Sequence, residues 1–352
     1  MNSMLLAWIA PLPDSGPEKA LNCTGDLMIG GARIAFMREP LLEDARFQVL
    51  ESPSEHIKLW LLEFFTRSSF KTRFVVAVRE LNATYMQTVK EGGQELDLGQ
   101  IEQNTFDQIG NRYGKQLIFK KDEHPSHHIL VCIENMEQEF EDARRVCSKW
   151  LRGANTLGKD QFECRSGRYL AVDGAGVGLI AAQELDIPLF QRMLVLFALS
   201  QGYMVAIERA IKRLADKCEH PKELEALYRD ALTFNARSFF RYPVKLKRNE
   251  LTRVWEQIEQ RFLISEHNQE LINQLDAVRR LLEERANRKA AKRDRWANFA
   301  LTFLGVLIGF LSLGALIDIT PEKVDSFIDG WSAWVQQHHL AGYFESLWMG
   351  KK

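Results

Sequence analysis

This chain of 352 residues has few cysteines and no excess of charge of either sign. Its five cysteines are scattered and never form a CxxC pair, which excludes a disulfide framework and a zinc-finger type of site. We interpret them as reduced, mostly buried cytosolic thiols. Lysine and arginine total 46 against 47 acidic residues. Proteins that bind nucleic acid usually carry a basic excess, so we expect no nucleic-acid partner.

Signals for secretion and nucleotide binding are also lacking. Residues 1–10 have no Lys or Arg before a short apolar stretch, which predicts a first strand and not a signal peptide. The run from Asp173 to Gly178 (DGAGVG) resembles a dinucleotide fingerprint, but that motif needs a small residue where Leu179 stands. We therefore interpret the run as a tight turn, with a nucleotide loop as the alternative.

Catalytic and metal-binding patterns are equally weak. His124, His127 and His128 (HPSHH) match no standard metal spacing, so a polar loop before a strand is favoured over a metal site. Nucleophiles and paired carboxylates do not occur in a recognisable catalytic arrangement. We expect no enzyme activity, no cofactor and no bound metal.

What the chain does contain is one long charge-free apolar run near its C-terminus. Residues 299–317 read FALTFLGVLIGFLSLGALI, nineteen residues without a charge. As a helix they rise roughly 28 Å, close to the thickness of a bilayer core. The run predicts one transmembrane helix over residues 296–318, with a buried helix of a soluble domain as the alternative.

The flanks of this run differ in charge. Acidic residues dominate after it, whereas a lipid-facing basic cluster precedes it: Arg285, Arg288, Lys289, Lys292, Arg293 and Arg295. The positive-inside rule then places the N-terminal part in the cytoplasm of a single-pass protein of a bacterial-type inner membrane. We expect the cluster to contact anionic lipid headgroups; a nucleic-acid site is the less favoured alternative.

Small and hydroxyl side chains recur along one side of the predicted span. Thr302, Gly305, Gly309 and Ser312 step by three, four and three, and the two glycines form a GxxxG. Small residues let membrane helices approach closely, so this stripe predicts helix packing in a homo-oligomer or the lining of a pore. Ordinary tolerance of glycine in a membrane helix is the alternative. Residues 319–352 are rich in aromatics with near-helical spacing, which predicts an interfacial amphipathic tail.

The first half of the chain mixes short apolar runs with turn signals. It predicts a cytosolic α/β domain over residues 1–185, so the fold class of the whole chain is α+β. We expect helices over 57–65 and 137–150, loops at glycines 92–93 and 110–114, and strands over 4–9, 33–37, 74–78, 116–119, 128–133 and 168–172.

A helical bundle and stalk are predicted over residues 186–295. Apolar runs and prolines indicate helices over 187–214 and 222–240, and residues 248–295 form a helical pattern without proline or glycine. Leu251, Trp255, Ile258 and Phe262 repeat at heptad-like spacing, as do four apolar residues from Leu271 onward, and the frame breaks at 265–269. This pattern predicts a coiled-coil stalk that enters the membrane segment; a soluble helix pair is the alternative.

Two segments carry a resemblance to a known family. Residues 234–262 (FNARSFFRYPVKLKRNELTRVWEQIEQRF) and 285–317, in the order helix pair, stalk and membrane segment, resemble the CorA-type divalent-cation transporter superfamily. The resemblance implies a homopentamer with a pore lined by the helix that continues the stalk. The chain lacks the Gly-Met-Asn tripeptide and the second span of that family, so it implies no particular metal ligand here.

Two functions remain open from the sequence. The first is a membrane-anchored oligomeric protein whose cytosolic part senses or binds a partner, such as a membrane effector in defence. The alternative is a CorA-like cation transport or channel protein. The polarity of one face of residues 299–317 and the mass in detergent distinguish them, since a monomer cannot form such a pore.

Overall fold

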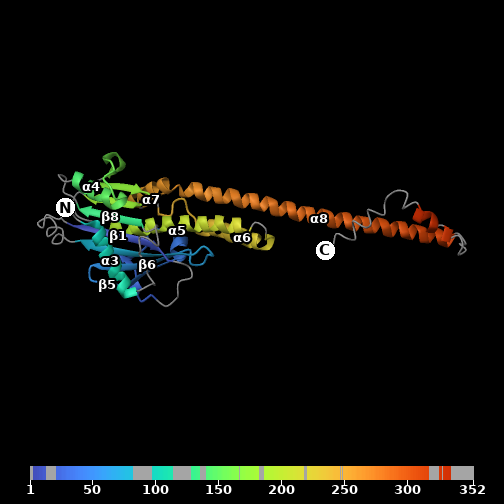
Figure 1. Ribbon diagram of the computed structural model, residues 1–352, viewed down its shortest axis with the longest axis horizontal. Coiled ribbons are helices and arrows are strands. Elements are labelled where there is room, and N and C mark those ends of the chain that lie inside the picture. The colour runs from blue at the N-terminus through green and yellow to red at the C-terminus, as the bar shows by residue number, and fades with distance from the viewer. Residues whose placement is uncertain are drawn as a thin grey trace. The chain divides into compact units, whose positions relative to one another are not determined.

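The computed structural model describes residues 3–12, 21–81, 97–113, 128–134, 140–165, 167–181, 186–217, 220–245, 247, 249–316, 325–326 and 328–333. The chain divides into two compact units, residues 1–280 and residues 281–352. The first unit is a mixed α+β structure in which one large sheet is covered by helices, and this agrees with the expected class (Figure 1). Two short elements complete it: α1 (Glu39–Glu43) and the 3-10 helix η3 (Lys159–Gln161).

The described strands form a nine-stranded sheet in the order β2-β5-β6-β7-β1-β8-β11-β10-β9. Neighbouring strands in it are antiparallel, except that β8 and β11 run parallel. A separate hairpin joins β3 (Met28–Ile29) and β4 (Ala32–Arg33). The bounds of the sheet strands are β1 Met4–Pro11, β2 Cys23–Asp26, β5 Ala45–Ser54, β6 Ile57–Phe64, β7 Thr72–Leu81, β8 His128–Glu134, β9 Glu163–Arg165, β10 Arg168–Asp173 and β11 Gly176–Ala181.

Helices cover both faces of this sheet. Alternate side chains of β1, including Trp8, belong to a core that also contains residues of α3 (Leu98–Tyr113) and α4 (Phe140–Arg152). The intervening side chains of β1 are equally buried. Their face carries α5 (Ile187–Lys217), which packs on β6 and β7. Central strands that are apolar on both faces are expected wherever helices cover both sides of a sheet.

One glycine sets how closely α5 lies on the sheet. A Cβ atom at Gly202 would stand 3.0 Å from Thr72 Oγ1 and about as near to Phe64 and Phe65 as van der Waals contact allows. Phe65 stacks on Tyr203, with ring centroids 5.3 Å apart, although its own φ is +57°. The absence of a side chain at position 202 therefore permits this aromatic contact between α5 and the end of β6.

The prediction of a helix over residues 57–65 is wrong, because these residues form β6. Its side chains are buried on both faces of the sheet, from Leu59 and Leu61 on one side to Trp60 and Leu62 on the other. A strand of that kind has no polar alternation, so its sequence cannot be told from a buried helix by periodicity. The length of eight residues is the only local sign of a strand.

Of the other local predictions, some are confirmed, some are wrong and some lie outside the described residues. The strands over 4–9, 74–78, 128–133 and 168–172 and the helix over 137–150 are confirmed, as β1, β7, β8, β10 and α4. The strand over 33–37 is wrong, since β4 ends at Arg33 and only an isolated bridge from Met37 to Val244 follows. Gly110 lies inside α3 and not in a loop. Residues 92–93, 114 and 116–119 lie outside the described part of the chain.

The helical region begins as expected but is interrupted at a different place. Helices α5 and α6 (Pro221–Arg237) match the predicted pair, and α6 and α7 (Asn249–Phe262) pack on α5. The single pattern over 248–295 is in fact α7 and α8 (Ile264–Leu316), separated by Leu263 with a φ of +50°. The break therefore precedes the frame shift that the heptad pattern indicated at 265–269.

The start of the predicted stalk packs within the chain. Leu271 and Leu275 are 0% and 1% exposed. Beside them Asn268 of α8 and Asn235 of α6 exchange two amide hydrogen bonds of 2.8 and 3.1 Å. A helix pair inside the first unit therefore accounts for this part of the apolar seam, which leaves it no free surface for a partner subunit.

Candidate functional site

The part of α8 that lies in the second unit exposes an unusual amount of apolar surface. Eight large apolar side chains between positions 296 and 308 are 48–70% exposed: Trp296, Phe299, Leu301, Phe303, Leu304, Val306, Leu307 and Ile308. Successive residues advance by about 100° around a helix, so these side chains cover an arc of roughly 220°. An exposed apolar surface of this extent is normally covered by other protein or by lipid.

The basic cluster lies on α8 directly before this apolar surface. At about 100° per residue the six basic side chains fall within an arc of roughly 160°, and Asp294 lies on the opposite side together with alanines. Arg288 forms an ion pair with Glu284 at 3.6 Å. Among the residues that the structure describes, the other five make no ion pair and are exposed. Their charges are therefore available to an anionic partner.

The four residues of the predicted packing stripe all lie within α8. Thr302 is exposed, and its hydroxyl donates a 2.8 Å hydrogen bond to the carbonyl oxygen of Asn298. A Cβ atom at Gly305 or Gly309 would meet nothing within 4 Å. The side chain of Ser312 lies outside what the structure describes. Within the described chain the glycines thus face open space, and Asn298 extends the stripe by one turn, which the sequence reasoning missed.

A different helix satisfies the criteria of length and apolarity for crossing a membrane. Among the described residues this is α5, and 72% of its most apolar window is buried inside the protein. Core helices of globular domains pass the same test. The polar side chain of Gln201 in this helix is also buried, at 8% exposure.

The predicted amphipathic tail is described only in part. Residues 325–326 and 328–333 have helical backbone, and Ile328 and Trp331 are 57% and 50% exposed. The rest of residues 319–352, including the adjacent His338 and His339, lies outside the described part of the chain.

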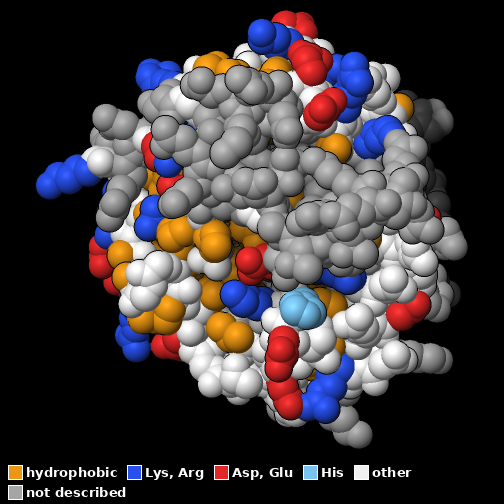
Figure 2. Space-filling model, turned by 90° about the vertical axis from the view of Figure 1, so that its left-hand side faces the viewer, with side chains coloured by type: hydrophobic (Ala, Val, Ile, Leu, Met, Phe, Trp, Pro, Cys, Tyr) orange, Lys and Arg blue, Asp and Glu red, His pale blue; other side chains and the backbone are white. Residues whose placement is uncertain are grey.

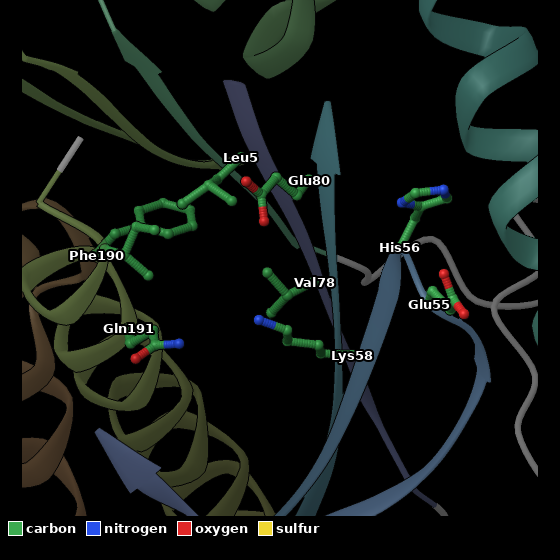
Figure 3. A pocket seen from close by; sticks show the side chains of 9 residues that line it. Leu5, Glu55, His56, Lys58, Val78, Glu80, Phe190 and Gln191 are labelled. Atoms are coloured by element: carbon green, nitrogen blue, oxygen red, sulfur yellow. The ribbon is translucent and has the colours of Figure 1, made fainter. Parts of the chain in front are cut away.

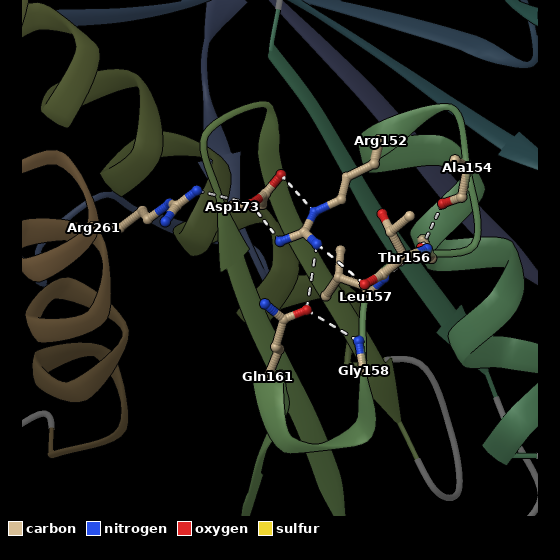
Figure 4. Close-up of polar contacts among 9 residues, drawn as sticks. Arg152, Ala154, Thr156, Leu157, Gly158, Gln161, Asp173 and Arg261 are labelled. Carbon is tan, nitrogen blue, oxygen red and sulfur yellow. Dashed lines mark hydrogen bonds and ion pairs between the residues drawn. The ribbon is translucent and has the colours of Figure 1, made fainter.

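A second polar site joins α7 to the sheet, and the sequence analysis missed it. The run DGAGVG forms the β10–β11 hairpin, where Asp173 pairs with Gly176 across the turn, so the prediction of a tight turn is confirmed. Asp173 is only 8% exposed. Arg152 of α4 donates to it from Nε at 3.2 Å and from Nη2 at 2.9 Å, and Nη2 of Arg261 in α7 lies at 3.1 Å (Figure 4).

These arginines determine the ionisation of Asp173. Burial alone would raise the pKa of its carboxyl group, but the hydrogen bonds and charge of Arg152, the Gly174 amide and the charge of Arg261 outweigh it. The pKa of Asp173 is therefore lowered, and the carboxylate is charged at neutral pH. Arg152 in turn is held by the Thr156 carbonyl oxygen at 3.3 Å (Figure 4).

The same face of α7 makes three more contacts with this edge of the sheet. Glu250 pairs with Arg168 of β10, and Glu163 of β9 accepts from Gln257 and lies 3.6 Å from Arg253. With Arg261, the α7 residues of this polar face are spaced by three, four and four, as one side of a helix requires. The opposite apolar face carries Leu251, Trp255 and Ile258, all buried. The helix that leads into α8 is therefore fixed to the sheet on one side and to α5 on the other.

The cysteines only partly follow the sequence interpretation. Cys147 is fully buried, and burial raises the pKa of its thiol to about 12. Cys23 and Cys164 are exposed, so the expectation of mostly buried thiols is wrong for these two. They lie on β2 and β9, the outer strands of the sheet, where one side of the strand has no neighbour.

Metal ligands do not gather in the part of the chain that the structure describes, where no group of three or more His, Cys, Asp or Glu could hold an ion. His128 opens β8 opposite Ile9, whereas His124 and His127 fall outside the described residues. On the face shown in Figure 2, basic and acidic side chains are interspersed around apolar ones.

Comparison with known proteins adds no relative, since no family model, curated protein or solved structure matches this chain.

Proposed function

We propose that this chain is a membrane-anchored oligomeric protein in which a large α+β part senses or binds a partner and α8 inserts in the membrane. The observation that carries the proposal is the apolar surface of α8 over positions 296–308, which is exposed over roughly 220° of the helix circumference. Transfer of such surface from water to lipid is favourable at roughly 25 cal/mol per Å². No enzymatic step is part of this proposal.

The basic cluster on α8 supports the same function and indicates how the chain would be oriented in the membrane. Five of its six cations lack an ion pair among the described residues, and each contributes about 1 kcal/mol near an anionic membrane surface. Together with the positive-inside rule, they support a single-pass inner-membrane protein whose N-terminal part lies in the cytoplasm. The membrane effector in defence remains our example of such a protein.

Assembly into a homo-oligomer follows from the stripe at Thr302, Gly305 and Gly309. Among the described residues, nothing lies within 4 Å of a Cβ atom at either glycine, so this surface is open to a helix of another molecule. The buried seam at Leu271 and Leu275 is excluded as the assembly surface because α8 uses it inside the chain.

Vesicle flotation tests the membrane function. We expect the full chain to float with vesicles of phosphatidylglycerol and phosphatidylcholine and to stay bound in 1 M salt, where surface charge is screened within about 3 Å. The double substitution Leu304→Asp and Leu307→Asp should abolish salt-resistant flotation, because each charge costs about 2.5–3.5 kcal/mol at the centre of a span.

Leu281→Asp is the matched control, since Leu281 is 53% exposed on α8 but lies before the basic cluster. It should float like the wild type. Release of the wild-type protein by salt, or unchanged flotation of the double variant, would show that α8 does not insert.

Cation transport of the CorA type is the second candidate, and the polar stripe favours it. Asn298 and Thr302 place an amide and a hydroxyl on the side of α8 that carries Gly305 and Gly309, as a pore lining requires. Gly309→Leu should insert normally but lose assembly or ion flux in liposomes. A monomer in detergent would exclude the pore and leave the anchor.

A further inference from the structure

A surface cavity of about 220 Å³ lies between the sheet and the beginning of α5. Its sheet side carries Leu5 of β1, Lys58 of β6, and Val78 and Glu80 of β7. Its helix side carries Ile187, Phe190 and Gln191 of α5. Figure 3 shows Lys58 and Glu80 projecting from the sheet toward this space and Phe190 and Gln191 closing it from α5, whereas His56 and Glu55 stand at the outer rim.

The floor of the cavity is apolar and its charged groups are unsatisfied. Leu5, Val78 and Phe190 are 3%, 6% and 0% exposed, so they form a fixed apolar surface. Among the described residues, the side chains of Lys58 and Glu80 make neither a hydrogen bond nor an ion pair. The cavity thus combines one cation, one anion and an apolar wall.

The relative position of these two residues follows from the strand register. Lys58 stands opposite Val78, and Glu80 lies two residues further along the same face of β7. The Cα atoms of diagonal neighbours of this kind are roughly 7–8 Å apart, and both side chains project toward the same space (Figure 3). A small molecule with a carboxylate and an ammonium group can lie between them, its carboxylate toward Lys58 and Gln191 and its ammonium toward Glu80.

From this arrangement we infer that the cavity binds a free α-amino acid with an apolar side chain. The carboxylate and ammonium groups of the ligand satisfy Lys58 and Glu80, and its side chain lies on Leu5, Val78 and Phe190. A volume of about 220 Å³ accommodates an amino acid of the size of leucine but not a nucleotide. This inference goes beyond the proposed function because it names the chemical class that the sheet-containing part recognises.

Calorimetric titration of the full detergent-solubilised chain with L-leucine, L-isoleucine and L-methionine tests the inference. We expect at least one to bind in the micromolar to millimolar range. For the one that binds best, the analogue without the carboxylate and the analogue without the amine should each bind at least tenfold more weakly. For leucine these are 3-methylbutylamine and 4-methylpentanoate.

Two substitutions locate the site. Lys58→Met and Glu80→Gln should each weaken binding at least tenfold, and both positions are exposed, so folding is retained. Glu55→Gln at the outer rim is the matched control and should bind as the wild type does. The inference is overturned if none of the three amino acids binds at 10 mM, if an analogue binds as tightly as its parent, or if both substitutions leave binding unchanged. Vesicle flotation of the same variants should stay normal in every case, so failure here is distinguishable from failure of the membrane function.

Discussion

At the scale of single residues, two glycines in helices face opposite surroundings. Gly202 of α5 lies against the sheet, where an added Cβ would stand 3.0 Å from Thr72 Oγ1. Gly110 of α3 has nothing within 4 Å of the same position. The composition of the two helices does not distinguish these glycines, because only the tertiary neighbour differs.

We therefore expect Gly202→Ala and Gly110→Ala to change stability in opposite directions. Overpacking at position 202 should lower the free energy of unfolding by about 1–3 kcal/mol. At position 110 the helix propensity of alanine should raise it by roughly 0.5–1 kcal/mol. Denaturant unfolding in detergent measures both, and a stabilised Gly202→Ala variant would contradict the close approach of α5 to the sheet.

Two residues with positive φ adopt backbone conformations that the sequence does not predict. Leu263 and Phe65 adopt φ values of +50° and +57°, which non-glycine residues rarely do. Nothing in the side chain of a leucine or phenylalanine signals that conformation. The sequence therefore did not predict that α7 ends at Phe262. It correctly predicted that Leu251, Trp255 and Ile258 are buried, but it missed the buried Val254, and Phe262 is only half-buried.

At the scale of elements, α7 is the helix whose role the sequence least revealed. Its apolar repeat was readable, but the partners of its polar face are on β9, β10 and the β10–β11 hairpin, far away along the chain. The prediction of a helix in place of strand β6 was wrong for a related reason, since burial on both faces removes the alternation that marks a strand. Periodicity identifies a buried face but not the element that covers it.

The ion pairs of Asp173 with Arg152 and Arg261 should make the contact between α7 and the β10–β11 hairpin dependent on pH. The pKa of Asp173 is lower in the folded chain, so its contribution to stability is present above the unfolded value near 3.9 and is lost as pH falls through the folded value. Asp173→Asn should lower the free energy of unfolding at pH 7 by roughly 1–3 kcal/mol, as loss of hydrogen bonds to a charge does. That difference should shrink below about pH 4.

Asp142→Asn on the exposed side of α4 is the control for this measurement. Asp142 is 75% exposed and lies 4.0 Å from Arg145, so its loss should change stability little at any pH. A difference between wild type and Asp173→Asn that stays constant from pH 7 to pH 3 would show that the carboxylate is not the group that holds α7.

At the scale of the whole molecule, the division after Arg280 separates two kinds of surface. The first unit ends where the buried residues of α8 end, since Leu281 is already 53% exposed. We expect a chain that ends at Arg280 to unfold cooperatively, with a Tm within a few degrees of the full chain, and to lose flotation with vesicles. Loss of cooperative unfolding would show that residues 281–352 support the fold of the first unit.

The sequence predicted the fold class and the order of the main elements better than the way in which these elements pack together. The α+β class, the paired helices and the apolar and basic stretches of α8 follow from composition and periodicity alone. The strand order could not be predicted, because pairing between distant strands leaves no local signal. The cavity beside Lys58 and Glu80 was equally hidden, since β6, β7, β1 and α5 meet there only in the folded chain.

The central place of β1 has a consequence for the order of events during synthesis. Its residues are made before those of the other described strands and lie between β7 and β8, so the sheet cannot close until residue 134 has left the ribosome. The parallel partner β11 is complete only at residue 181. One edge of this apolar strand can pair once β7 is complete at residue 81, whereas its other edge stays unpaired for more than a hundred residues. The apolar part of α8 emerges only after every described strand of the sheet has been made, so those strands have all their described partners before the exposed apolar surface of α8 is available.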